Sequence, residues 1–150
     1  MAAGEILVEQ AADSVDRFDL VYPIIFNYRH GLEVAIKWVL DRYGRYASIG
    51  TYEKNHKLLD LWKPCRQVIE QVGGPGDVDA LNAVEQIVTE FDSIDPGALS
   101  FRYSTTKRGQ VVDLPDFAID LDNLCGVMEG VNNFFIGVDG QLDHNSSAIP

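Results

Sequence analysis

Three ionisable residues lie within two turns of the most apolar predicted helix of the chain. Arg29, His30 and Glu33 belong to the stretch YPIIFNYRHGLEVAIKWVL, residues 22–40, which otherwise has the pattern of a buried helix. Residues three and four apart are neighbours on a helix, so Glu33 lies beside Arg29 and His30 and also reaches Lys37. The pattern fits an anion-handling site, and it fits equally a solvated helix edge with ion pairs.

A second candidate is His56, which lies at or near the start of the next predicted helix. The helix dipole disfavours a charged imidazole at that end and keeps it neutral, so that it can act as a base or as an acceptor. A capping or surface histidine would have the same position. If the protein is an enzyme, His30 and His56 are the candidate acid and base, and no residue is assigned as catalytic.

The third candidate is Arg102, which stands between two aromatic residues in the segment FRYSTTKRG. Arginine has the geometry best suited to bidentate contact with phosphate. Lys107 and Arg108 follow it closely, and we include them among the anion-binding candidates. A charged, solvent-exposed hairpin tip is the alternative reading of these two residues.

Charge is unevenly distributed along the chain. The 150 residues contain 12 Lys and Arg against 23 Asp and Glu, a net charge of −11, which argues against indiscriminate binding of nucleic acid or anionic membrane. Residues 28–66 nevertheless hold eight bases and four acids, and three more bases lie between residues 102 and 108. If the two segments meet in space, they form a local anion site.

Apolar periodicity predicts four helices. The first runs from about Asp13 to Tyr43 and is either kinked or divided at Pro23. The second covers residues 56–72, with Asn55 or Thr51 as its cap, and GGPG ends it. Asp77 caps the third.

A short hairpin or loop is expected over residues 101–112, and the last helix is expected to run from Leu114-Pro115-Asp116 to about Val138. The prediction is therefore an all-α fold, a bundle of four to five helices, with one helical domain over residues 1–140 and a flexible tail over 141–150.

Several classes of protein and of site are excluded. The start of the chain lacks a basic segment typical of a signal peptide, and the apolar run of residues 20–28 is too short to span a bilayer, so we expect a cytoplasmic protein without membrane contact. No glycine-rich phosphate loop or hydrolase motif occurs. The histidines and cysteines lack metal-ligand spacing, so we expect neither a metal nor a cofactor, and Cys65 and Cys125 fit reduced core thiols.

The segments NYRHGLEVAIKWVL, NHKLLDLW and FRYSTTKRG resemble the HEPN superfamily, small helical domains of prokaryotic defence and toxin–antitoxin systems. The similarity covers roughly residues 22–138. It implies a bundle of four or five helices, homodimerisation, and association with nucleotides or RNA. The residues that match letters of the pattern are Arg29, His30, Glu33, His56 and Arg102.

The chain departs from the motif of the ribonucleases in that superfamily, an Arg followed four to six residues later by a His. Tyr103 follows Arg102, and no His occurs through Gly109. The resemblance therefore implies a cationic pocket for nucleotide or RNA phosphate, in a divergent or inactive ribonuclease of a defence or stress-response system. Any cleavage would be metal-independent.

A second reading comes from the acidic composition. The predicted last helix and the residues before it carry Asp113, Asp116, Asp120 and Asp122, which would give a negative edge. Such an edge is suited to binding a basic protein partner, in the manner of an antitoxin or inhibitor. The sequence thus leaves open a non-catalytic interaction module.

Overall fold

The computed structural model describes residues 2–12, 17–94 and 120–148. Within them the chain forms five α-helices and one 3₁₀ helix, with no strand. These are α1 (Ala2–Ala12), α2 (Arg17–Tyr43), η1 (Gly44–Ala47), α3 (Leu58–Gly73), α4 (Val78–Ile94) and α5 (Leu121–Ser146). The all-α prediction is confirmed. The expected hairpin at 101–112 lies outside the described residues.

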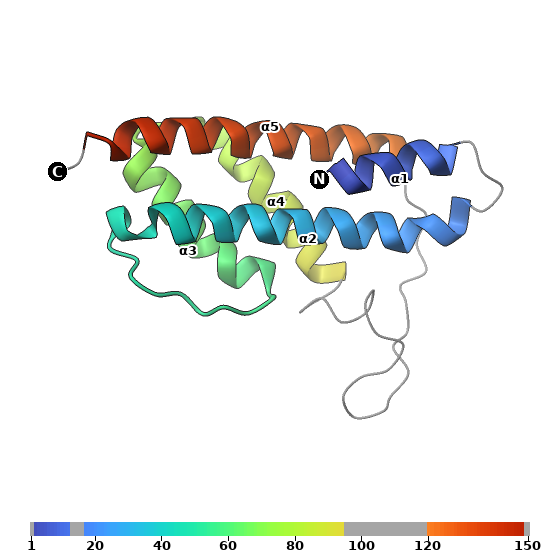
Figure 1. The fold of residues 1–150 in the computed structure, drawn as a ribbon, viewed down its shortest axis with the longest axis horizontal. Coiled ribbons are helices and arrows are strands. Elements are labelled where there is room, and N and C mark those ends of the chain that lie inside the picture. The colour runs from blue at the N-terminus through green and yellow to red at the C-terminus, as the bar shows by residue number, and fades with distance from the viewer. Residues whose placement is uncertain (1, 13–16, 95–119, 149–150) are drawn as a thin grey trace, which may run out of the picture.

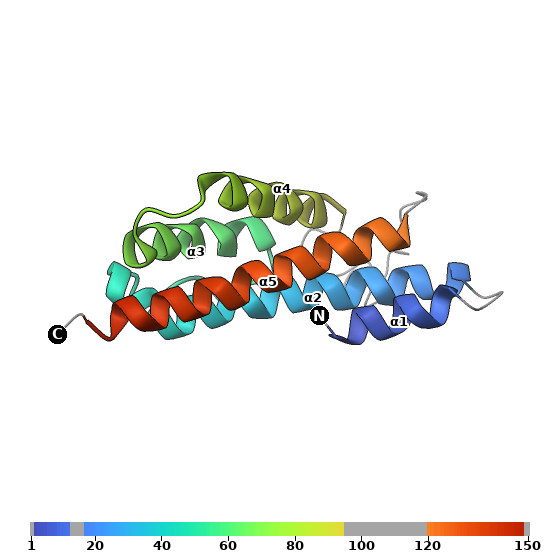
Figure 2. The ribbon, with the colours of Figure 1, turned by 90° about the horizontal axis from the view of Figure 1, so that it is seen from above.

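The two longest helices, α2 and α5, run side by side along the long axis, and α1 packs against both (Figure 1). Seen from above, α3 and α4 form a second layer on this group (Figure 2). A core of buried apolar side chains draws on all five helices. Trp62 of α3 lies within it and meets the edge of Phe135 of α5, with ring centroids 6.5 Å apart.

Helix α3 follows the apolar pattern of its sequence. Its apolar residues at helical spacing form one stripe, and all of them are buried: Leu58, Leu61, Trp62, Cys65, Val68, Ile69 and Val72. The predicted cap is wrong, because the helix begins after Lys57 and neither Asn55 nor Thr51 caps it. The carboxylate of Asp92, at the end of α4, accepts the Leu58 N–H instead at 2.8 Å. A neighbouring helix thus supplies the missing acceptor.

The connection from α3 to α4 agrees with the prediction. Helix α3 ends at Gly73, and Gly74 has φ +77°, a left-handed conformation that glycine adopts without steric cost. The Asp77 carboxylate then accepts the Ala80 N–H at 3.0 Å, as an N-cap does.

The last helix, α5, ends later than predicted. Asp120 is extended and caps α5 by accepting the Asn123 N–H at 3.0 Å, so α5 begins at Leu121. The expected start at Leu114-Pro115-Asp116 lies outside the described residues. Helix α5 continues through the expected tail to Ser146. The side chains of Gln141 and Asn145 donate to backbone carbonyls at the end of α3, and Leu142 is fully buried. These contacts fix the last turns of the helix.

Helix α1 was not predicted. Val8 and Ala11 are buried, and Gly4 lies directly against the ring of Tyr28, where an added Cβ would come within 2.6 Å of Cε1. Helix α2 is continuous through Pro23 and ends at Tyr43 as expected. The expected start near Asp13 lies outside the described residues.

The extension of α5 gives a test of the fold. Leu142→Ala should lower the free energy of unfolding by about 3 kcal/mol, because it leaves a cavity in a packed core. His144→Ala, on the exposed face two residues on, should change it by less than about 0.5 kcal/mol. Urea denaturation of both variants measures the difference. Equal, small effects would show that residues beyond 140 do not pack on the domain.

Candidate functional site

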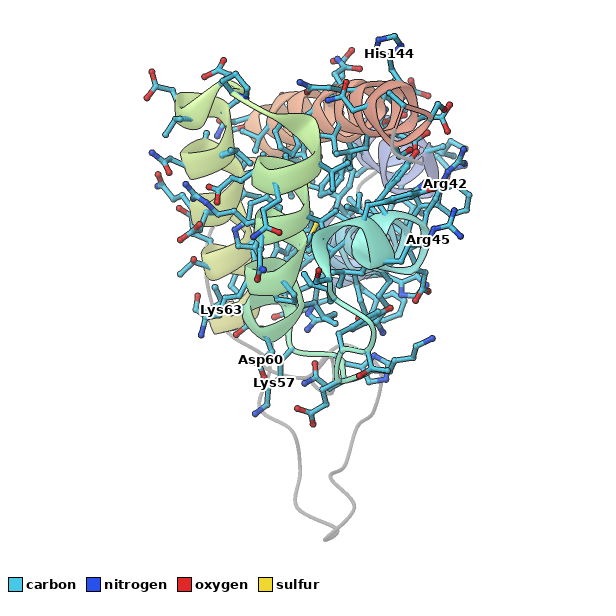
Figure 3. All side chains as sticks on the ribbon, turned by 90° about the vertical axis from the view of Figure 1, so that its left-hand side faces the viewer. Arg42, Arg45, Lys57, Asp60, Lys63 and His144 are labelled. Carbon is cyan, nitrogen blue, oxygen red and sulfur yellow. The ribbon has the colours of Figure 1, made fainter. Side chains whose placement is uncertain are left out.

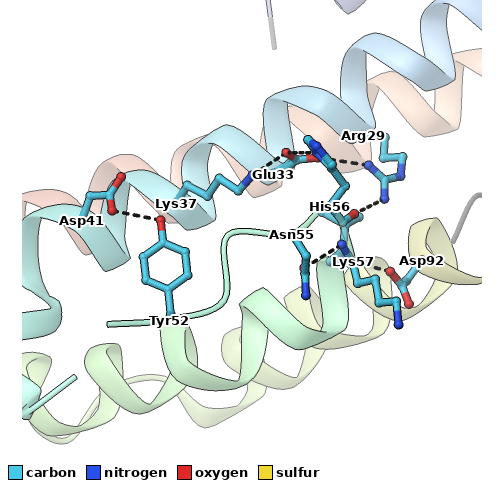
Figure 4. A network of polar contacts seen from close by, with 10 residues as sticks. Arg29, Glu33, Lys37, Asp41, Tyr52, Asn55, His56, Lys57 and Asp92 are labelled. Atoms are coloured by element: carbon cyan, nitrogen blue, oxygen red, sulfur yellow. Dashed lines mark hydrogen bonds and ion pairs between the residues drawn. The ribbon is translucent and has the colours of Figure 1, made fainter. Parts of the chain in front are cut away.

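Four charged residues line one face of α2 at a spacing of four. They are Arg29, Glu33, Lys37 and Asp41, with alternating sign along the helix. The segment that joins η1 to α3, residues 48–57, runs back along this face (Figure 4). Contacts from Tyr52, Lys54 and His56 tie the segment to the helix.

The Glu33 carboxylate is the centre of these contacts. Its Oε2 accepts from Arg29 Nη1 at 3.2 Å, and its Oε1 accepts from Lys37 Nζ at 2.7 Å. His56 Nδ1 lies 2.9 Å from the same Oε1 (Figure 4). Because an ionised carboxylate only accepts hydrogen bonds, His56 must carry a proton on Nδ1. Its neutral form is then the Nδ1–H tautomer, with Nε2 as acceptor.

Arg29 joins the helix to the backbone of the segment. Its Nη2 donates to the carbonyl oxygen of His56 at 2.6 Å, while Nη1 is bonded to Glu33. The planar guanidinium presents several donors in one fixed arrangement, which suits contact with a carboxylate and a carbonyl together. Arg29 therefore fixes the His56 backbone, and Glu33 fixes its ring.

Because Arg29 and Glu33 are buried, the stability of this cluster depends on the ion pairs and hydrogen bonds that they form. Arg29 is 1% exposed and Glu33 is 3% exposed, so each charge has lost its hydration. Burial alone would raise the pKa of Glu33, but the hydrogen bonds from Lys37 and His56 outweigh it and hold that pKa below its ordinary value. Glu33 is therefore ionised at neutral pH. The His56 side chain, in contrast, is 52% exposed.

A second set of contacts lies further along the same face. The Tyr52 hydroxyl donates to Asp41 Oδ1 at 2.9 Å, and Lys54 Nζ lies 3.6 Å from that oxygen. Burial and the hydrogen bond to Asp41 raise the pKa of Tyr52 to about 12, so its hydroxyl keeps its proton. The 48–57 segment is thus held to α2 through Asp41 at one place and through Glu33 and Arg29 at another.

The structure brings together some of the predicted residues. Arg29, Glu33 and His56 are in direct contact. His30 is exposed, and its ring stacks on Phe26 with centroids 6.0 Å apart, so it does not join the Glu33 cluster. The other predicted residues lie outside the described part of the chain: Arg102, Lys107 and Arg108.

Sequence reasoning missed Asp41 and Tyr52. The charged residues from Arg29 to Asp41 recur at every fourth position, and this repeat could have indicated that the Asp41 carboxylate lies on the same face of the helix. Nothing in the sequence indicated that Tyr52 would reach it.

The cluster can hold and move a proton at one atom. Within the described residues no hydrogen bond engages Nε2 of His56, which leaves it as the atom that can accept or donate a proton. In the same residues no three His, Cys, Asp or Glu side chains are grouped as metal ligands would be. The described helices also include none that combines the length and apolar character needed to cross a membrane.

Comparisons with protein-family models, with curated proteins and with solved structures found no match.

Replacing the central carboxylate tests its role. Glu33→Gln should lower the free energy of unfolding by about 3 kcal/mol at neutral pH, because it breaks the buried ion pair between Arg29 and Glu33. The pKa of Glu33 is lowered in the folded state, so its stabilisation is present at neutral pH and is lost as pH falls through the folded pKa. The difference between native protein and variant should therefore shrink in acid.

Urea denaturation at several pH values measures this difference, with the exposed Glu53→Gln as control. A difference that stays constant from neutral to acid pH would contradict an ionised, paired Glu33.

Proposed function

We propose that the protein binds the phosphate group of a nucleotide or of RNA at the surface formed by Lys37 and His56. One observation carries the proposal. A buried, ionised carboxylate holds the ring of His56 by Nδ1, and the ring stays half exposed. This arrangement fixes the imidazole while its other nitrogen is left for a ligand.

The charge around His56 supports an anion as that ligand. Lys37 Nζ and His56 Nδ1 contact the same oxygen of Glu33, so a positive charge lies beside the ring. Lys57 projects next to His56 at the start of α3 (Figure 3), and it forms no ion pair within the described residues. In a chain of net charge −11, these two lysines would attract an anion to this surface.

The roles of the residues follow from their exposure. His56 and the 23% exposed Lys37 can contact a ligand, whereas Arg29 and Glu33 are buried and position His56. Arg29 was expected from sequence to hold the anion directly, and its burial favours the positioning role instead. If RNA is cleaved, His56 is one proton carrier and the exposed His30 is the candidate for the second.

The wider context is part of the same proposal. We place the protein with HEPN-like domains, as a cytoplasmic homodimer in a defence or stress-response system, acting on nucleotides or RNA or with a protein partner of that system. The all-α bundle supports this placement. So does the contact between two of the three segments that carry the resemblance, through Arg29, Glu33 and His56.

Binding measurements test the proposal. Calorimetric titration with short single-stranded RNA and with nucleoside monophosphates should show binding, and His56→Gln should weaken it at least tenfold because the ring contact to phosphate is lost. Raising the salt concentration should weaken binding of RNA, as counterion release requires. Lys63→Gln is the matched control, since it removes an exposed charge away from the ring and should have little effect.

The acidic interaction module remains the rival. If neither RNA nor any nucleotide binds, and a basic protein forms a stable complex with the purified chain, the phosphate proposal is wrong. The same conclusion follows if His56→Gln and Lys63→Gln weaken RNA binding equally, because the binding would then be non-specific.

A further inference from the structure

A cavity of about 420 Å³ lies beside the proposed phosphate surface, between α2 and the 48–57 segment. Its lining combines apolar side chains with charged ones. The lining residues are Leu40, Asp41, Arg45, Ile49, Gly50, Thr51, Tyr52 and Lys54. Tyr52 and Asp41 are the pair whose hydrogen bond holds the segment to α2.

We infer that this cavity receives the base of the same nucleotide whose phosphate lies against Lys37 and His56. The inference rests on the proposed function and assigns it a second subsite. It thereby names the ligand class as a nucleotide unit, either free or at the end of an RNA strand, and not inorganic phosphate or a sugar phosphate.

The two subsites are neighbours on one face of α2. Lys37 and Asp41 lie on that face, one helical turn apart, which corresponds to about 6 Å along the axis. Lys37 reaches toward Glu33 and His56, and Asp41 forms part of the cavity wall. The 48–57 segment borders both subsites, with His56 at one and Tyr52 at the other.

The chemistry of the wall suits a base. Leu40, Ile49 and the half-buried Tyr52 offer apolar surface for a flat ring. The Asp41 carboxylate can accept from ring N–H or amino groups, as carboxylates do with bases. Lys54 Nζ lies 3.6 Å from Asp41 Oδ1 and 5.8 Å from the centre of the Tyr52 ring. Because the Lys54 side chain is largely exposed, it can turn toward the sugar or the phosphate of the nucleotide.

Three other cavities lack this combination. They lie against α4, with volumes of about 230, 300 and 480 Å³. Each is lined by at least one carboxylate, respectively from Glu90 and Asp120, from Asp77, and from Glu70, and by no Lys or Arg. The cavity beside Asp41 also has Arg45 and Lys54 at its wall, which suits a ligand that carries phosphate.

Blocking the cavity tests the inference on the full-length protein. Thr51 is exposed and lines the cavity, so Thr51→Trp should fill it, and Thr51→Ser is the matched control. The probes are nucleoside 5′-monophosphates and ribose 5-phosphate, which carries the phosphate without a base. We expect Thr51→Trp to weaken nucleotide binding at least tenfold and to leave ribose 5-phosphate unaffected, whereas His56→Gln weakens both.

The outcomes separate this inference from the proposed function. If Thr51→Trp leaves nucleotide affinity unchanged while His56→Gln lowers it, phosphate binding holds and the base subsite is wrong. If neither probe binds the native protein and short RNA does not bind either, both proposals are wrong.

A measurement on the native protein covers the case in which Thr51→Trp does not fold. Titration with a nucleotide, followed by amide NMR shifts, should move Thr51 and Tyr52 together with His56. Ribose 5-phosphate should move His56 and leave Thr51 and Tyr52 in place. Equal shifts of all three with both probes would overturn the inference.

Discussion

The Glu33 carboxylate is almost completely removed from water, in a helix whose apolar face is packed into the core. A carboxylate in such a place is tolerated when charged or polar donors replace its hydration. Arg29 and Lys37 come from the same helix, one turn to either side, and His56 comes from a segment with no regular structure. The position of that segment therefore depends on the buried charge.

The rest of the fold places these partners. Helix α3 begins at Leu58, two residues after His56, and its apolar stripe is packed in the core, so the end of the 48–57 segment is fixed in space. Asp92 of α4 holds the first turn of α3 through the Leu58 N–H. At the other end, Ser48 adopts a left-handed conformation and the Ile49 N–H donates to the Gly44 carbonyl, which turns the chain back toward α2. The core thus determines where the segment starts and ends, and the polar contacts determine its course.

The features that could be predicted correctly from the sequence are those that follow from the spacing of residues along one helix. The stripe of α3 has seven apolar residues at helical spacing, and all seven are buried. The pairing of Arg29, Glu33 and Lys37 followed from their spacing on one helix. The end of α5 was not predictable in this way, because residues after Val138 are mainly polar and are held by Gln141 and Asn145 against carbonyls of α3. Those contacts join residues about seventy apart in the chain.

The same limit applies to the site. His56 was singled out for its type and its place before a helix, but its contact with Glu33 depends on how the intervening segment folds back. His30 is next to Arg29 in sequence and is nevertheless turned to solvent beside Phe26. Its position next to Arg29 in the sequence led to the prediction that His30 belongs to the cluster, which is not the case. The histidine that does contact Glu33 is His56, 23 residues further along the chain.

The central claim is that Glu33 is ionised and is held so by its donors. A pH titration of the Glu33 side-chain carboxyl carbon by ¹³C NMR measures this directly. We predict a pKa below the ordinary glutamate value, because hydrogen bonds from Lys37 and His56 outweigh the effect of burial. A pKa at or above the ordinary value would contradict the account, since the donors would then not compensate for the loss of water.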